Sequence, residues 1–132
     1  MLVVELTEKE RLMLVEKKKE IQKLTSELFD IKDDPKQTTR MKKKITSILS
    51  ALSTIGSYVK TRDFDLNVFS TMAESIFADL SGMPWDATIF ADRASDKIEK
   101  FCIYANSIQF DFARKDFRII VPKIDISIFR AK

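Results

Sequence analysis

The sequence contains no histidine, a single cysteine and two glycines in 132 residues. Without histidine, the chain cannot build a Ser-His or Cys-His catalytic pair, and it has no imidazole to ligate a metal or carry a proton. Cys102 alone excludes an internal disulfide and a cysteine-based zinc site. Gly56 and Gly82 are too far apart to form a glycine-rich phosphate loop. These absences predict a protein that is not an enzyme and that holds no cofactor and no metal.

Long hydrophobic runs are also missing. No apolar stretch approaches the ~20 residues that a spanning helix needs, and 33% of the residues are charged. Residues 1–10 begin with apolar side chains but have no basic lead and no cleavage site, so we expect no signal peptide. The apolar fraction of 45% suffices for a packed core. We therefore expect one domain over residues 1–132 with no membrane span, located in the cytoplasm, or in a virion if a virus encodes it.

Residues 7–62 carry the pattern of a long helical hairpin. Thr7 and Glu10 have the spacing of a capping box, which starts the first helix. The second helix is expected over residues 35–62, with Asp34 as its cap and Pro35 in its first turn. Apolar residues recur at helical spacing in both; they are Leu14, Ile21 and Leu28 in the first helix, and Met41, Ile45, Ile48, Leu52, Ile55 and Val59 in the second. The short connector makes the two helices antiparallel.

Two further helices are expected within residues 63–109. The first is capped by Asp65 and ends at Gly82, since glycine is a common residue just past a helix and Pro84 prevents continuation. The second can start at Asp86, with a break near Ser95. Each has one apolar face; the faces consist of Phe69, Met72, Ala73, Ile76, Phe77 and Leu80, and of Phe90, Ala94, Ile98, Phe101, Ala105 and Ile108.

The pattern changes in the C-terminal segment, residues 110–132, which is alternating or β-branched. Ile124, Ile126 and Ile128 fall on one face of an extended segment, and residues 113–116 suit a turn between two short strands. The last strand can instead pair with residues 2–6, a short β-branched stretch, or dock on a neighbouring molecule. The expected fold is mostly α, an antiparallel bundle of about four helices with a small C-terminal β-hairpin that the N-terminal strand can join.

Basic residues gather in the second helix. The net charge of +3 divides into +5 for residues 1–62, −6 for residues 63–112 and +4 for residues 113–132. No acid lies between Lys36 and Arg62, and the first third of the helix holds five candidates for contact with a polyanion: Lys36, Arg40, Lys42, Lys43 and Lys44. The helix macrodipole disfavours cations at this end. A solvated face balanced by acids of the first helix, such as Glu16, Glu20 and Glu27, is the competing interpretation, and a membrane surface is a third.

The outer face of the same helix continues with small hydroxyl side chains, at Ser47, Ser50, Thr54 and Ser57. A solvated helix usually carries Lys and Glu in such positions, and small residues let another backbone approach closely. The face is therefore either an ordinary polar surface or an interface with another helix of this chain or of a second copy.

Three classes of function remain. The favoured one is a non-enzymatic helical assembly protein whose partner is itself or another protein. The alternative is a nucleic-acid-binding or packaging protein that grips non-specific nucleic acid through the basic helix and the basic tail; the third is an enzyme whose site the sequence hides. The Lys- and Ile-rich composition, with few Asn, Gln and Cys, is similar to that of small proteins of thermophiles and their viruses. That similarity favours a viral structural role, but it identifies no family.

Overall fold

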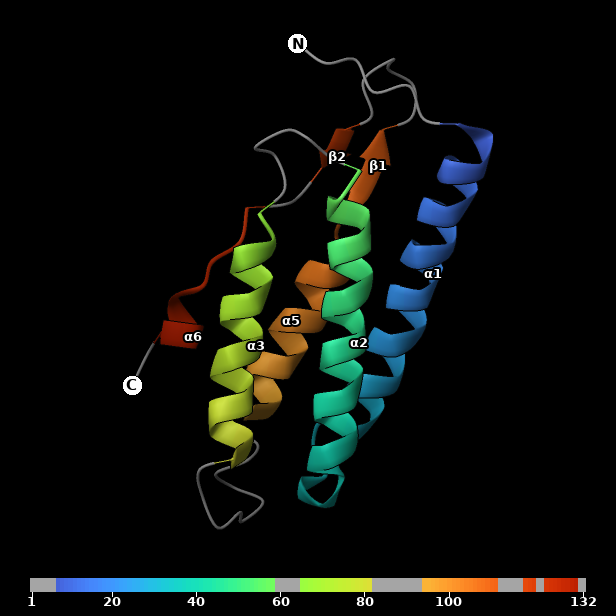
Figure 1. The fold of residues 1–132 in the computed structure, drawn as a ribbon. Coiled ribbons are helices and arrows are strands. Elements are labelled where there is room, and N and C mark those ends of the chain that lie inside the picture. The colour runs from blue at the N-terminus through green and yellow to red at the C-terminus, as the bar shows by residue number, and fades with distance from the viewer. Residues whose placement is uncertain (1–6, 59–64, 82–93, 112–117, 121–122, 131–132) are drawn as a thin grey trace.

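The computed structural model describes residues 7–58, 65–81, 94–111, 118–120 and 123–130. In these parts of the chain, four helices lie side by side: α1 (Glu8–Ile31), α2 (Thr38–Gly56), α3 (Leu66–Ser81) and α5 (Asp96–Asn106). Successive helices point in opposite directions (Figure 1). Both α1 and α3 contact α2 and α5, so the four helices form a ring around one core. The predicted mostly helical bundle is confirmed.

The start of the helical hairpin is built as its sequence predicts. Thr7 and Glu10 form the capping box, in which each side chain accepts a hydrogen bond from the backbone N–H of the other residue. At the connector, the Asp34 carboxylate accepts the backbone N–H of Lys36 at 3.0 Å. The first turn after Pro35 is a short 3₁₀ helix, η1 (Pro35–Gln37), and the α-helix begins only at Thr38.

Helix α2 ends earlier than the sequence predicts. The apolar spacing extends to Val59 and predicts an end near residue 62, but the last helical residue is Gly56. The backbone N–H groups of Ser57 and Tyr58 close the helix by bonding to carbonyls of the preceding turn. Glycine is a poor helix former because it loses the most backbone freedom on folding. The side chains beyond Tyr58 lie outside the described residues.

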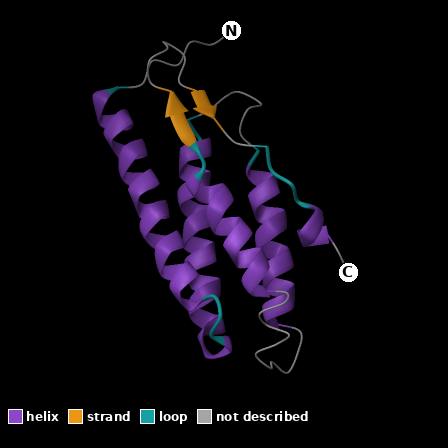
Figure 2. Cartoon of the chain, turned by 180° about the vertical axis from the view of Figure 1, so that it is seen from behind, coloured by secondary structure: helices purple, strands orange, loops and turns teal. Residues whose placement is uncertain are grey.

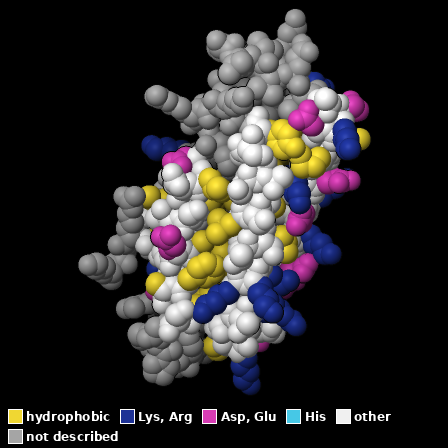
Figure 3. Space-filling model, in the orientation of Figure 1, with side chains coloured by type: hydrophobic (Ala, Val, Ile, Leu, Met, Phe, Trp, Pro, Cys, Tyr) yellow, Lys and Arg dark blue, Asp and Glu magenta, His cyan; other side chains and the backbone are white. Residues whose placement is uncertain are grey.

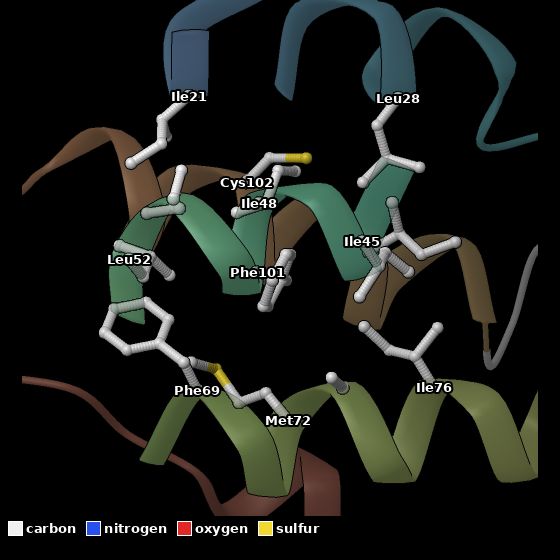
Figure 4. Packing of buried hydrophobic residues seen from close by; sticks show 14 of the residues in the cluster. Ile21, Leu28, Ile45, Ile48, Leu52, Phe69, Met72, Ile76, Phe101 and Cys102 are labelled. Atoms are coloured by element: carbon white, nitrogen blue, oxygen red, sulfur yellow. The ribbon is translucent and has the colours of Figure 1, made fainter. Parts of the chain in front are cut away.

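The core is continuous and is shared by all four helices. The predicted apolar rows of α1, α2 and α3 are buried almost without exception. In Figure 4, Ile21 and Leu28 of α1 point toward α2, while Phe69, Met72 and Ile76 of α3 point into the core from the other side. The rings of Phe69 and Phe101 meet edge to face, with centroids 6.3 Å apart. Aromatic side chains thus connect α3 to α5, whereas the α1–α2 hairpin is packed with aliphatic residues.

The C-terminal segment departs most from expectation. Strands β1 (Gln109–Asp111) and β2 (Arg118–Ile120) pair antiparallel, with Phe110 opposite Ile119, but the pairing spans only three residues of each strand. A β-hairpin that organises residues 110–132 is therefore not supported. The predicted last strand is wrong, because Ser127–Arg130 form a short helix, α6. The predicted N-terminal strand and the helix start at Asp86 lie outside the described residues.

Tertiary contacts explain why the alternating isoleucines do not form a strand. Phe129 is buried against the core, and its carbonyl accepts a hydrogen bond from the Ser75 hydroxyl of α3 at 2.8 Å. The Asp125 carboxylate accepts the backbone N–H of Ser127 at 2.9 Å and so starts α6. Tyr104 of α5 fixes the preceding backbone through its hydroxyl, which accepts the N–H of Asp125. Among the described residues, the segment is held by the helices and not by a partner strand.

Candidate functional site

The N-terminal end of α2 presents a group of cations. Lys36, Arg40 and Lys43 are all exposed, and their spacing of four and three residues places them on one side of the η1–α2 unit. Within the described residues, none of the three forms an ion pair. Figure 3 shows basic side chains at this lower end of α2. We call Lys36, Arg40 and Lys43 the basic end.

The other two predicted cations point elsewhere. Lys42 donates a hydrogen bond to the Ser81 hydroxyl at the end of α3, at 2.9 Å. The Lys44 ammonium lies 2.8 Å from a carboxylate oxygen of Glu27 on α1. Its hydrogen bond to Glu27 lowers the pKa of that carboxyl, in spite of the opposing effect of burial. Lys42 and Lys44 therefore join α2 to its two neighbours, and the structure brings together three of the five cations.

The four predicted interface residues occur together on the outer side of α2. Ser47, Ser50 and Ser57 are exposed, and Thr54 is half-buried. Thr46 and Ser53 extend the group to six hydroxyl residues between positions 46 and 57, a stretch without a charged residue. We call these six residues the hydroxyl face. In Figure 3 it forms an uncharged band along α2, and no other helix of the described chain covers it.

Several of these hydroxyl groups are already bonded to their own helix. Thr46 donates to the Lys42 carbonyl at 2.8 Å, and Thr54 donates to the Ser50 carbonyl at 3.1 Å. Ser57 donates to the Thr54 carbonyl at 2.7 Å. A hydroxyl that bonds back to a helix carbonyl keeps its donor satisfied without water. Removing this face from water is therefore less costly than burying free donors.

Hydrophobic side chains border the hydroxyl face. Figure 3 shows an apolar strip between α2 and α3, beside the uncharged band. Half-buried residues of these two helices that pack on the core include Leu49 and Phe77. The lack of charge on this helix surface, beside apolar side chains, agrees with the depletion of charged residues at the centre of protein interfaces.

A second surface, between α1 and α5, was not predicted from the sequence. Phe29 and Ile103 are 45% and 47% exposed, and both line a hollow of about 300 Å³ between these helices. The polar side chains of Gln22, Thr25 and Asn106 also line it. In the sequence, both apolar residues fall outside the rows of apolar residues that recur at helical spacing. That position is the only sign in the sequence that their side chains are exposed.

The chemistry of the described residues is limited. Burial raises the pKa of the Cys102 thiol to about 12, so that it stays protonated at neutral pH and is a poor nucleophile. In the described parts of the chain, no group of three or more His, Cys, Asp or Glu side chains is placed to hold a metal ion. None of the helices there has both the length and the apolar character that crossing a bilayer requires.

Comparison with known proteins adds no relative. No family model matches the sequence, and no curated protein and no solved structure is significantly similar to it.

Proposed function

We propose that this chain is a non-enzymatic assembly protein that works through contacts with copies of itself. The observation that carries the proposal is the hydroxyl face of α2, which is uncharged over three turns and exposed except at the half-buried Thr54. The contrast with α1 is informative, because the exposed residues of α1 include Glu16, Lys19 and Glu20. From residue 45 onward, the exterior of α2 lacks the charged residues of an ordinary solvated helix.

Packing of a second helix on the hydroxyl face is physically reasonable. Small side chains allow two helix axes to approach closely, and the hydroxyl protons of Thr46, Thr54 and Ser57 are already donated within the helix. Three of the six hydroxyl groups thus keep a bond when water is removed, which lowers the cost of contact. A structural role in a larger particle, including a virion, would use contacts of this kind.

The test is a charge placed at the centre of the hydroxyl face. We expect the wild-type chain to self-associate in a concentration-dependent way in size-exclusion chromatography with light scattering. Ser50→Glu should shift the equilibrium toward the monomer, because a buried unpaired carboxylate is strongly unfavourable. Ala78→Glu adds the same charge at an exposed position of α3 and should leave the association unchanged. A wild-type chain that stays monomeric at every accessible concentration would refute the proposal.

Nucleic-acid binding is the second candidate, and the basic end supports it. Lys36, Arg40 and Lys43 are exposed together without a nearby partner in the described residues, at a helix end where the macrodipole also attracts phosphate. Binding to random duplex DNA should then weaken steeply as salt is raised, with ~0.9 in the logarithmic slope for each phosphate contact. Replacing the three cations by Gln should flatten that slope. Absence of binding at low salt would exclude this function.

A further inference from the structure

The face formed by α1 and α5 combines exposed apolar side chains with a hollow between them. It lies on the far side of the bundle from the view of Figure 3 and faces the reader in Figure 2, where no described element crosses it. Three large hydrophobic side chains are exposed among the described residues, and two of them, Phe29 and Ile103, line this hollow. The Lys32 ammonium lies 4.9 Å from the centroid of the Phe29 ring and holds that ring at the rim.

Polar groups at the floor of the hollow already have hydrogen-bond partners within the chain. Thr25 is buried, and its hydroxyl lies 2.8 Å from the Ile21 carbonyl and 3.0 Å from the Asn106 side-chain oxygen. The Cys102 thiol donates to the Thr25 carbonyl. A ligand would therefore find few free polar groups at the bottom, while the apolar rims remain uncovered. This arrangement suits a protein surface that rests on Phe29 and Ile103 more than a polar small molecule.

The charges on the outer side of α1 are arranged so that the helix is complementary to itself. Lys19 and Lys23 precede Ser26, and Asp30 and Asp33 follow it; all five residues are exposed. The spacings from Ser26 are seven and three residues on the basic side, and four and seven on the acidic side. When two copies of α1 pack antiparallel about Ser26, Lys23 faces Asp30 of the other copy. Lys19 faces Asp33, which lies just beyond α1 and also bonds to Lys32 and Ser95 of its own chain. Both pairs then occur twice, as a two-fold axis requires.

The acid at the end of α1 occupies a position where a cation is favoured. Cations are the favourable residues near a helix C-terminus, but the last turn of α1 has no basic residue and contains Asp30. Within the described residues, Asp30 forms no ion pair. Its position is unfavourable for an isolated chain, and a cation supplied from outside the chain would offset it.

We propose that a second copy of this chain docks on the α1–α5 face by a two-fold axis that runs across the helices near Ser26. In this dimer α1 packs antiparallel on α1 of the other copy, Lys23 meets Asp30 twice, and the rims formed by Phe29 and Ile103 cover each other's hollow. The proposal rests on the proposed self-association, but it concerns a surface other than the hydroxyl face.

The test uses two charge-reversal variants of the full chain, and each variant alone should associate more weakly than the wild type. Lys23→Glu places two acids against each other and Asp30→Lys places two cations against each other, so each variant should weaken the dimer by about tenfold or more. An equimolar mixture should associate again, because the new carboxylate at position 23 of one variant then faces the new ammonium at position 30 of the other, while the second pair keeps its wild-type residues. Lys9→Glu, an exposed reversal in the first turn of α1, is the matched control and should associate like the wild type.

Stability measurements separate loss of association from loss of folding. Asp30→Lys places the favoured charge at the helix end, so its monomer should be at least as stable as the wild-type monomer while its association is weaker. If both reversals associate like the wild type, or if the mixture does not recover, the two-fold arrangement is refuted. If the wild type associates and only Ser50→Glu disrupts it, the proposed function stands and this inference fails.

Discussion

The ammonium of Lys97 on α5 lies 2.7 Å from a carboxylate oxygen of Asp79 on α3, and this ion pair is the most buried of those among the described residues, with side chains 12% and 20% exposed. Lys97 also donates to the Ser75 hydroxyl at 2.9 Å, and Ser75 in turn donates to the carbonyl of Phe129. These contacts connect α3, α5 and α6.

Removing one charge of this ion pair should lower the free energy of unfolding more than removing both charges. Lys97→Met leaves the buried Asp79 carboxylate without its cation and should lower the free energy of unfolding by about 3 kcal/mol. The double variant Lys97→Met/Asp79→Leu removes both charges and should recover much of that loss. Urea unfolding of the two single variants and the double variant measures the coupling. Additive effects would show that the pair contributes no coupling energy.

The loss of stability when a leucine is truncated to alanine should depend on how deeply that leucine is buried. Leu52 of α2 is fully buried, and Leu52→Ala should lower the free energy of unfolding by about 2–5 kcal/mol through lost transfer energy and a cavity. Leu12 of α1 is 58% exposed, and Leu12→Ala should cost less than about 1 kcal/mol. Thermal or urea unfolding checks both. Similar losses at the two positions would contradict the packing described for α2.

The Cys102 thiol should be unreactive in the native protein. Burial raises its pKa from 9.0 to about 12, so it is neither ionised nor accessible at about pH 8. A disulfide reagent should modify it rapidly only after unfolding. The control is Ala78→Cys in a Cys102→Ala background, which puts a thiol at an exposed position of α3 outside the proposed contact surfaces and should react at once. Rapid modification of the native wild type would show that α1 and α5 separate readily.

Acid should weaken the junction of α1 and α5. The Ser95 hydroxyl, followed by the Lys32 ammonium, lowers the pKa of the Asp33 carboxyl below its ordinary value of 3.8. A lowered pKa in the folded state stabilises the fold above pH 3.8, and this contribution is lost as the pH falls below that value. Because Asp33 is exposed, Ser95→Ala should cost less than about 1 kcal/mol at neutral pH.

The pH dependence identifies the source of that loss. The cost of Ser95→Ala should shrink in acid, where the Asp33 carboxyl is protonated in the folded and unfolded states alike. Ser81→Ala serves as the control, because Ser81 bonds to Lys42 and not to an acid. Its smaller effect should stay constant from about pH 3 to about pH 7. A cost of Ser95→Ala that is equally constant would mean that Asp33 does not contribute through its charge.

Local sequence signals are sufficient to predict the position of a helix that is capped and has a long apolar row. The capping box of Thr7 and the four-three spacing from Met41 to Ile55 predict α1 and α2. The predicted cap Asp65 precedes α3, where its carboxylate accepts the N–H of Asn67. The apolar row alone could not place the end of α2, because Val59 continues it. The helix is closed there by the backbone hydrogen bonds of Ser57 and Tyr58, which the apolar pattern does not reveal.

Long-range contacts account for what the sequence could not predict. Ile124, Ile126 and Ile128 alternate as in a strand, but burial of Phe129 and its bond to Ser75 favour a helical turn. The same applies to the candidate surfaces. The cations of the basic end were visible in the sequence, whereas the pairing of Lys44 with Glu27 depends on how α1 and α2 pack, and the hollow beside Phe29 depends on α5, which lies more than sixty residues away.

The short η1 connector has a consequence for the order of folding. It makes most contacts between α1 and α2 local in sequence, and local contacts close early because they lose the least chain entropy. The hairpin that forms first already contains all of the hydroxyl face and the α1 half of the opposite face. During synthesis on the ribosome, α3 and α5 emerge later. A newly made hairpin therefore exposes its association surfaces, together with its uncovered aliphatic core, before the rest of the chain can shield that core.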